Sequence, residues 1–494
     1  MKKTKIVATI GPASDSKEVL RELIQSGLNV CRINFSHGTY ETNGKVITMV
    51  RELSKELGVP VGIMVDLQGP RIRTVVSEDV EIKNGEYIWI SDVSVGDNFK
   101  FEILNLPAGR QGFNSISNDK ISNKKIFLDW PEIVNDINIG ESILIEDGLK
   151  RLVVVEKEGK SLVAEVINGG VIKNHKGVNV PDSKLKIGAV TKKDEEDLAY
   201  AMSREVDFIA LSFVSNGQEI EETREKMKKL LGREDNLPQI VAKIERKEAI
   251  KNIDEIIAAT DVIMVARGDL GIEMDETKVV IYQKEIIAKC IKAVRPVIVA
   301  TQMLESMIQN PIPTRAEVSD VSNAVIDHAD AVMLSGESAN GKFPQKAVET
   351  MSQIITDTED SRFDDFSCVD FDNNKEQDYV AIIESAYNLA KQSDPKAIVA
   401  ITVSGLTARL ISHFRPMQSN FIATTSEKVY NQLSLVWGVE SYLLEDMDKE
   451  KLIENMLERL KSEKKIEVGD KVVVVLGRIP GGDKMRLVGI REIN

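Results

Sequence analysis

Short apolar runs, each followed by a stretch with helical spacing, recur along the chain. Eight of these runs can be counted, at residues 5–11, 30–35, 62–68, 207–213, 239–245, 262–270, 296–304 and 331–338. Such repetition is typical of parallel strands that crossover helices bury on both faces. Eight units of this kind predict a closed (β/α)₈ barrel, a TIM barrel of the α/β class.

The third unit is interrupted by residues 71–172, which have a different pattern. Turn pairs such as Asn84-Gly85 and Asp147-Gly148 separate short apolar or alternating runs there, as in successive β-hairpins. We therefore predict an inserted small β-barrel, with the (β/α)₈ barrel formed by residues 1–70 and 173–360. Residues 106–120, rich in Gly, Asn and Ser, are expected to form an extended loop.

The last helical pattern of the barrel ends near Glu359, and the acidic segment 364–378 that follows is typical of a linker. Apolar runs then recur at residues 397–403, 421–424, 441–444, 472–476 and 487–490. They predict a C-terminal α/β domain over residues 361–494. The last two runs are joined too briefly for a crossover helix, so one of these strands should be antiparallel.

Composition and charge exclude several classes of protein. The chain has 494 residues, and a single hydrophobic core stops growing near about 250–300 residues, so more than one domain is expected. The net charge of −14 speaks against a main role in nucleic-acid binding. Because no apolar run approaches the roughly 20 residues that span a bilayer, no membrane is expected. The three cysteines are scattered, as in a reducing compartment, so we expect a cytoplasmic protein.

Polar residues close nearly every predicted strand, and in such barrels the active site lies at that end. They are Arg32, Asn34, Ser36, His37, Asp66, Lys243, Glu245, Arg267, Asp269, Thr301, Gln302, Ser335 and Glu337, with Arg71 and Arg73 close behind. Glu245 and Asp269, on adjacent strands, suit Mg²⁺, which takes a few carboxylates plus substrate oxygens; two solvated acids are the alternative. Lys243 shares a face with Glu245 and suits charge stabilisation or an ion pair.

Phosphate recognition is suggested by two arginines at the same rim. Arg32 and Arg73 each offer a rigid fork of donors that fits a phosphate, although a single arginine would more often form a surface ion pair. The peptide at Gly268 leaves room for a substrate carboxylate to approach backbone N–H groups. His37 is expected to donate a hydrogen bond, because no second His lies near it to complete a metal site.

With these residues placed, the sequence resembles the pyruvate kinases over essentially its full length. The motifs are KIVATIGP at 5–12, RINFSHG at 32–38, KIE at 243–245, MVARGDLG at 264–271, ATQML at 300–304, PTRAE at 313–317 and MLSGE at 333–337. The resemblance implies transfer of the phosphoryl group of phosphoenolpyruvate to ADP, the last step of glycolysis. It also implies a barrel with an inserted lid and a C-terminal regulatory domain.

Roles for the matching residues follow from the resemblance. Lys243 would stabilise the enolate-like transition state, Glu245 and Asp269 would hold Mg²⁺ or Mn²⁺, and Arg32 would grip the transferred phosphoryl group. Gly268, Asp269 and Thr301 would bind the substrate carboxylate, with Thr301 close to the carbon that is protonated. Asn34, His37, Arg73 and Lys176 would bind the nucleotide phosphates under the closing lid.

One departure from the family concerns its second cation. Potassium-dependent members hold K⁺ at the positions of Asn34, Ser36, Asp66 and the carbonyl of Leu67, and carry Glu where this chain has Arg71. A fixed guanidinium there could supply the charge of K⁺. The sequence therefore predicts that K⁺ is weakly required or not required.

The resemblance also suggests regulation and assembly. Thr402, Ser404, Gly405 and Thr407 resemble the effector loop that binds a phosphorylated small molecule at a helix N-terminus, although the loop at residues 476–482 is shorter than in members activated by fructose 1,6-bisphosphate. A homotetramer is usual in the family. Two alternatives remain open: a Mg²⁺-dependent barrel lyase acting on phosphoenolpyruvate or pyruvate, and an inactive homologue that binds metabolites.

Overall fold

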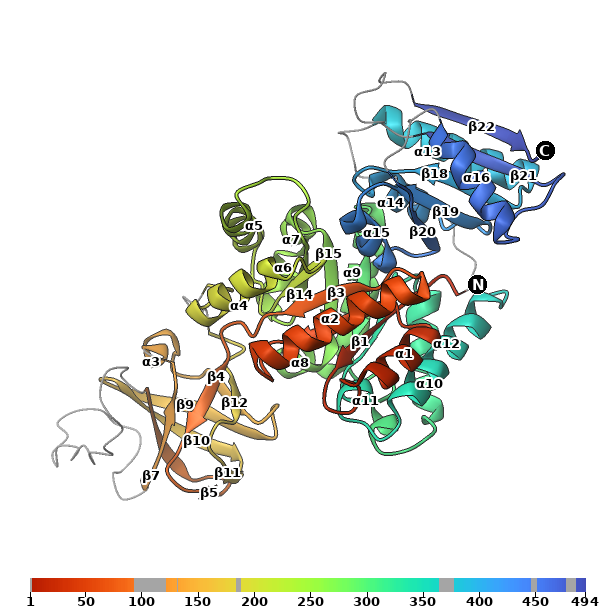
Figure 1. Cartoon of the computed structure of the whole chain (residues 1–494). Coiled ribbons are helices and arrows are strands. Elements are labelled where there is room, and N and C mark those ends of the chain that lie inside the picture. Colours follow the sequence, from red (N-terminus) through yellow and green to blue (C-terminus); the bar gives the residue numbers. More distant parts are fainter. Residues whose placement is uncertain are drawn as a thin grey trace. The chain divides into compact units, whose positions relative to one another are not determined.

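The computed structural model describes residues 2–92, 121–130, 132–183, 188–363, 377–445, 451–476 and 486–494 (Figure 1). The chain forms two compact units. The first comprises Met1–Gly69, Ala189–Gly268 and Val279–Asn494, and the second comprises Pro70–Gly188 and Asp269–Lys278. The predicted loop at 106–120, nearly all of the linker at 364–378 and most of the loop at 476–482 lie outside the described residues.

Eight parallel strands close a barrel in the first unit. They are β1 (Lys5–Ile10), β2 (Val30–Asn34), β3 (Gly62–Asp66), β13 (Phe208–Leu211), β14 (Gln239–Ile244), β15 (Val262–Ala266), β16 (Val297–Ala300) and β17 (Ala331–Leu334). Each strand pairs with its neighbour in the chain, and β17 pairs with β1 to close the ring. The predicted barrel is confirmed, and each apolar run contains one strand.

Helices cover the outside of this barrel. They are α1 (Lys17–Gln25), α2 (Tyr40–Leu57), α4 (Lys192–Ser203), α5 (Gly217–Leu231), α6 (Lys247–Lys251), α7 (Ile253–Ala259), α9 (Glu276–Lys292), η2 (Glu305–Ile308), α10 (Arg315–Ile326), α11 (Gly336–Ala339) and α12 (Pro344–Glu359). α8 (Arg267–Glu273) directly follows β15, and its residues from Asp269 onward belong to the second unit. Thr39, Thr191 and Thr314 start α2, α4 and α10 with capping boxes, which satisfy backbone donors at each helix start. No described helix is long and apolar enough to cross a membrane.

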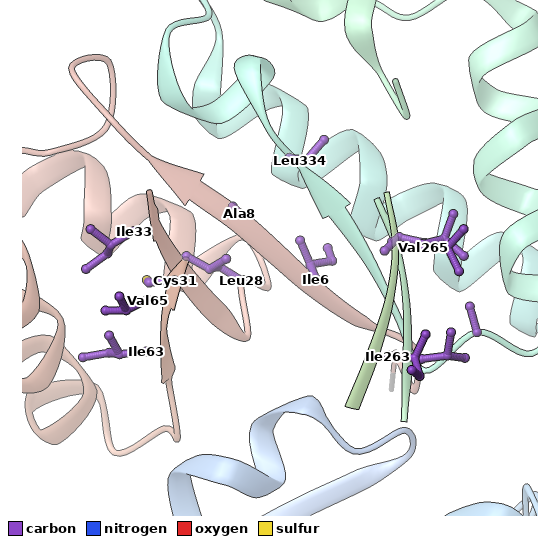
Figure 2. Packing of buried hydrophobic residues seen from close by; sticks show 14 of the residues in the cluster. Ile6, Ala8, Leu28, Cys31, Ile33, Ile63, Val65, Ile263, Val265 and Leu334 are labelled. Carbon is purple, nitrogen blue, oxygen red and sulfur yellow. The ribbon is translucent and has the colours of Figure 1, made fainter. Parts of the chain in front are cut away.

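Alternate residues of each strand enter two separate cores, because side chains alternate across a strand. Ile6 and Ala8 of β1 face the helices and pack with Ile33, Ile63 and other residues of the outer layer (Figure 2). Val7, between them, joins the core inside the barrel. The inside of the barrel is thus filled with apolar side chains, and polar groups are left to the strand ends.

The second unit contains another closed barrel, of mostly antiparallel strands. Its strands are β4 (Ile72–Val75), β6 (Tyr87–Asp92), β7 (Ile121–Leu128), β8 (Ser142–Ile145), β9 (Lys150–Glu158), β10 (Ser161–Asn168) and β12 (Gly177–Asn179), in the order β10-β6-β7-β4-β12-β8-β9. A separate pair joins β5 (Val80–Ile82) to β11 (Gly170–Ile172), and α3 covers Ile133–Asp136. The inserted small β-barrel is therefore confirmed.

The C-terminal part of the first unit is an open α/β sheet. Its elements are α13 (Gln377–Ser393), β18 (Ala397–Ile401), α14 (Leu406–His413), β19 (Ser419–Thr424), α15 (Glu427–Gln432), η3 (Leu433–Leu435), β20 (Val439–Leu443), α16 (Leu452–Ser462), β21 (Lys471–Leu476) and β22 (Leu487–Glu492). The strand order is β20-β19-β18-β21-β22, and only the pair β21 and β22 of this described sheet is antiparallel. This confirms the prediction from the short last connection.

Candidate active site at the barrel mouth

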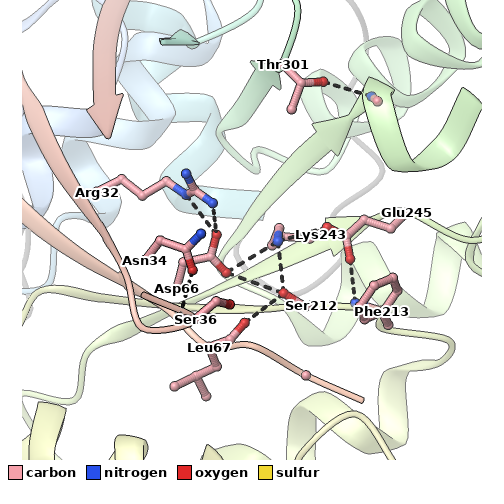
Figure 3. A network of polar contacts seen from close by, with 12 residues as sticks. Arg32, Asn34, Ser36, Asp66, Leu67, Ser212, Phe213, Lys243, Glu245 and Thr301 are labelled. Carbon is pink, nitrogen blue, oxygen red and sulfur yellow. Dashed lines mark hydrogen bonds and ion pairs between the residues drawn. The ribbon is translucent and has the colours of Figure 1, made fainter. Parts of the chain in front are cut away.

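Lys243 lies at the centre of a polar network at the C-terminal ends of the strands (Figure 3). Its Nζ is 2.8 Å from Oε1 of Glu245, 2.9 Å from Oγ of Ser212 and 3.3 Å from Oδ1 of Asp66. The residue is only 9% exposed, since β14 and its neighbours surround the aliphatic stem. The ammonium group is therefore held in one place by oxygens from three different strand ends.

Asp66 also binds Arg32, so one carboxylate joins two cations. Arg32 donates to Oδ2 of Asp66 from Nε at 2.8 Å and from Nη2 at 2.6 Å, and to Oγ1 of Thr9 from Nη1 at 2.7 Å. Burial alone would raise the pKa of Asp66, but the charges of Lys243 and Arg32 outweigh it and lower that pKa. Asp66 is thus a permanent anion that fixes both cations.

Glu245 follows β14 and is almost completely buried. Its Oε2 accepts a 2.7 Å hydrogen bond from the backbone N–H of Phe213, while Oε1 faces Lys243. Among the described residues no group of three or more His, Cys, Asp or Glu side chains forms a metal site. Two carboxylates together with substrate oxygens and water suffice for Mg²⁺, so Glu245, with its orientation fixed, fits the predicted ligand.

Thr301, directly after β16, is joined to the start of α8. Its Oγ1 accepts a 2.8 Å hydrogen bond from the backbone N–H of Gly268. A Cβ added to Gly268 would lie 3.4 Å from that oxygen, so the lack of a side chain keeps the approach open. The structure therefore brings together Gly268 and Thr301, while Asp269 belongs to the second unit.

Of the residues predicted for K⁺, Asn34, Asp66 and Leu67 have oxygens that accept hydrogen bonds from the protein itself. Oδ1 of Asn34 accepts from the N–H of Ser36 at 3.0 Å, and the carbonyl of Leu67 accepts from the hydroxyl of Ser212 at 2.8 Å. The two oxygens of Asp66 accept hydrogen bonds from Arg32 and Lys243.

The predicted nucleotide contacts fall in both units. Asn34 is the last residue of β2, and His37 lies in the segment that follows, where it is exposed. In the second unit, Arg73 of β4 pairs with Gly177, the first residue of β12, and Lys176 directly precedes that strand. Nζ of Lys176 is 2.7 Å from Oε1 of Glu146, which holds this cation in an ion pair.

Comparisons with known proteins identify the family of the chain. The sequence family described as "Pyruvate kinase, barrel domain" matches residues 1–348, and the family described as "Pyruvate kinase, alpha/beta domain" matches residues 380–486. The chain belongs to the pyruvate kinase family. The resemblance carried by the motifs is thereby confirmed, and as a pyruvate kinase family member the chain is a phosphotransferase.

Individual relatives extend the likeness along the chain. The pyruvate kinase of Clostridium perfringens is 41% identical over 98% of this chain and 99% of its own length. That of Geobacillus stearothermophilus is 43% identical over 89% of this chain and 71% of its own length. The crystal structure of a pyruvate kinase from Cryptosporidium parvum matches with a TM-score of 0.86 and 35% identity, covering 100% of this chain and 96% of that one.

The predicted effector loop of this pyruvate kinase fold precedes α14. Gly405 adopts a left-handed conformation with φ of 79°, and its N–H donates to Oγ1 of Thr402 at 3.0 Å. The hydroxyl of Thr407 is hydrogen-bonded to that of Tyr379. Of the three predicted hydroxyls only that of Ser404 belongs to an exposed residue.

Two residues of the site escaped the sequence prediction. Ser212 ends the fourth strand run without a charge, so its contact with Lys243 had no signal beyond its place at a strand end. Glu146 stands beside the turn at Asp147-Gly148, and a pattern of turns does not show that it pairs with Lys176. Both contacts join residues that are distant in the chain.

Proposed function

We propose that this chain transfers the phosphoryl group of phosphoenolpyruvate to ADP, giving pyruvate and ATP in the last step of glycolysis. The observation that carries the proposal is the buried ammonium of Lys243, fixed between Asp66, Ser212 and Glu245 at the barrel mouth. A preorganised cation stabilises negative charge that develops on an oxygen without costly reorganisation. Family membership supports the same reaction.

In the proposed reaction the bond between phosphorus and the enol oxygen breaks, and its electron pair stays on that oxygen. A new bond forms between phosphorus and a β-phosphate oxygen of ADP. The enolate of pyruvate then takes one proton at its terminal carbon to give pyruvate. Lys243 would hold the charge of the enolate oxygen, and Thr301, through its hydroxyl and a water molecule, would deliver the proton.

Binding of substrates would use the remaining residues. Arg32 would bind the transferred phosphoryl group. Asp66 contacts Nε and Nη2 of its guanidinium group and so fixes the orientation of that group. Gly268, Asp269 and Thr301 would bind the carboxylate of phosphoenolpyruvate. Asn34, His37, Arg73 and Lys176 would bind the phosphates of the nucleotide.

Pyruvate kinases are generally metal-dependent. We propose Glu245 and Asp269 as the ligands of Mg²⁺ or Mn²⁺. When bound, such an ion polarises phosphoryl and carboxylate oxygens as a Lewis acid. Glu245 would present its carboxylate to the ion in a fixed orientation, because the N–H of Phe213 holds one oxygen and Lys243 faces the other.

K⁺ is proposed to be dispensable. Asn34, Ser36, Asp66 and the carbonyl of Leu67 would form the K⁺ site of a potassium-dependent relative, but the oxygens of Asn34, Asp66 and Leu67 already accept hydrogen bonds from the protein. Arg71 adds a permanent positive charge five residues after Asp66 in the chain. Regulation by a phosphorylated small molecule at Thr402, Ser404, Gly405 and Thr407, a homotetramer and a cytoplasmic location complete the proposal.

A coupled assay tests the main reaction. The purified chain with phosphoenolpyruvate, ADP and Mg²⁺ is expected to form ATP and pyruvate in equal amounts, and Lys243→Met is expected to lower kcat by about a hundredfold to a thousandfold. Pyruvate formed without ATP would indicate a lyase or phosphatase instead. No turnover by the unmodified chain would indicate an inactive homologue. Screening phosphorylated sugars in the same assay tests the effector loop.

A further inference from the structure

Two consecutive residues after β16 have left-handed backbones. Thr301 has φ of 69° and Gln302 has φ of 53°. Residues other than glycine rarely adopt this region, and a β-branched residue such as threonine is strongly disfavoured there. A backbone of this kind persists only when its surroundings hold it. Something in the structure must therefore stabilise the peptide that carries the Thr301 hydroxyl.

Arg267, the first residue of α8, supplies that restraint. Its Nη2 donates to the carbonyl oxygen of Thr301 at 2.7 Å and to that of Gln302 at 3.2 Å. The side chain is buried, so few water molecules compete for these carbonyls. Both strained peptides thus share a single guanidinium group as their donor.

The guanidinium group is itself fixed by α10. Nη1 of Arg267 lies 2.7 Å from Oδ1 of Asp320, and Nη2 lies 2.7 Å from Oδ2 of the same carboxylate. This is an ion pair with two contacts, of which the one from Nη1 is a hydrogen bond, and two contacts set orientation as well as distance. Both terminal nitrogens of Arg267 are therefore committed to protein oxygens, and the group points at the main chain of residues 301–302.

Thr301 is consequently held at two places by neighbouring residues. Arg267 binds its carbonyl, and the N–H of Gly268 binds its hydroxyl at 2.8 Å. A displacement of the main chain at Thr301 that follows loss of the Arg267 contact would carry the Cα, and with it the hydroxyl, away from Gly268. The direction of the hydroxyl is thus coupled to the contact between Arg267 and the carbonyls.

We infer that Arg267 is a positioning residue for the proton transfer: together with Asp320 it clamps the left-handed peptide at 301–302 so that the Thr301 hydroxyl keeps its direction. The inference rests on the role proposed above for Thr301. Arg267 does not contact the reacting atoms. A lysine would keep the charge but lacks the planar fork, so it cannot bind both carbonyls and the carboxylate of Asp320 together.

The test separates proton transfer from phosphoryl transfer. In the reverse direction pyruvate loses a methyl proton before it is phosphorylated, so exchange of methyl hydrogen into D₂O in the presence of ATP and Mg²⁺ reports the proton step alone. Arg267→Lys is expected to slow this exchange by about tenfold to a hundredfold, as a displaced catalytic group does. The KM for ADP should stay within about twofold.

A second substitution relieves the strain without touching the hydroxyl. Gln302 is exposed, and glycine adopts a left-handed backbone without a steric penalty. The double variant with Arg267→Lys and Gln302→Gly should therefore exchange at least about threefold faster than Arg267→Lys alone. Asp320→Asn, which weakens the ion pair, should slow exchange in the same way but less.

Arg415→Lys is a matched control. Arg415 is also buried, lies 3.0 Å from Oδ1 of Asp330, and donates at 2.8 Å to the carbonyl of His328, whose φ is 64°. This variant should lose thermal stability to a similar extent but keep methyl exchange within about twofold.

Other outcomes would overturn the inference. If Arg267→Lys exchanges methyl hydrogen at the normal rate, Arg267 has a structural role only. The same holds if Arg267→Lys loses exchange rate that Gln302→Gly does not restore, while Arg415→Lys loses as much. Thr301→Val tests the underlying proposal separately: if that variant exchanges at the normal rate, the role of Thr301 fails, and the inference with it.

Discussion

Ser212 and Lys243 share one hydrogen bond across the mouth of the barrel, with 2.9 Å between Oγ and Nζ. The serine hydroxyl has one hydrogen, which it donates to the carbonyl of Leu67 at 2.8 Å. It therefore presents a lone pair to the ammonium group of Lys243 and fixes the rotation of that group. β13, which ends at Leu211, thus positions the cation at the end of β14.

Ser212→Ala is expected to lower kcat about tenfold, because a hydrogen bond to a charged group contributes roughly 1.5–3 kcal/mol and part of it would be replaced by water. Steady-state kinetics with both substrates measure the effect. Thr260→Val is the control, since the buried Thr260 hydroxyl also donates to a carbonyl, that of Ile240 at 2.9 Å. A drop in kcat of equal size in both variants would contradict a specific role for Ser212.

Most of the strand framework was predictable from the sequence because strands buried on both faces leave continuous apolar runs. The polar residues at strand ends were also predictable, because they interrupt apolar runs at the end of the barrel where active sites lie. Ser212 was not, because an uncharged serine at a strand end has no distinctive pattern. The left-handed Thr301 was not either, because threonine is among the residues least expected in that conformation.

Leu435 illustrates a further limit of the sequence. It belongs to η3 in the C-terminal domain, yet it lies in the core inside the barrel with Val30, Met64 and Phe208. Next to it, Oγ of Ser434 would lie only 2.6 Å from a Cβ at Gly62, the first residue of β3. A single leucine in a distant domain gives no sign that it fills the inside of the barrel.

Leu435→Ala is therefore expected to lower the free energy of unfolding by about 2–5 kcal/mol, as large-to-small changes at fully buried sites do. Urea unfolding followed by circular dichroism measures the loss. Leu443→Ala is the control, because Leu443 in β20 is 36% exposed and should change stability by less than about 1 kcal/mol. Equal effects of the two substitutions would show that Leu435 does not stabilise the barrel.

The burial of Lys5 leads us to expect a specific pH dependence of the free energy of unfolding. Lys5 is 4% exposed, its Nζ donates to the carbonyl of Val439 at 2.7 Å, and burial lowers its pKa from 10.5 to about 8 despite the charge of Glu359. Between these two pH values the unfolded chain holds a proton that the folded chain has lost. The contribution of Lys5 to stability should therefore rise with pH across this window, by up to about 3 kcal/mol.

The measurement is the difference in free energy of unfolding between the unmodified chain and Lys5→Met, from urea titrations at several pH values between 8 and 10.5. Taking the difference between the two proteins cancels the contributions of other titrating groups to stability. One such group is the Cys31 thiol, because burial raises its pKa to about 12. The exposed Lys160, replaced by Met, should show no such trend. A difference that stays flat or falls with pH would mean that Lys5 keeps an ordinary pKa.

The requirement for K⁺ is the remaining question at the barrel mouth. Arg32, Lys243, Asp66 and Glu245 contribute two positive and two negative charges, and three of the four residues predicted for K⁺, Asn34, Asp66 and Leu67, have oxygens that accept hydrogen bonds from the protein. With K⁺ replaced by tetramethylammonium, the rate should therefore change by less than about threefold. A fall of about a hundredfold or more would refute the proposal.

Arg71→Glu should create the requirement. The substitution removes a permanent positive charge and adds a negative one, so that an added monovalent cation would become favourable. The variant is expected to lose about a hundredfold in kcat in tetramethylammonium and to recover most of it in K⁺, with half-maximal activation measured by K⁺ titration. Lys464→Glu, the same charge reversal at an exposed residue of the C-terminal domain, should lose little in either salt. If K⁺ does not restore Arg71→Glu, Arg71 serves a purpose other than the charge of the cation.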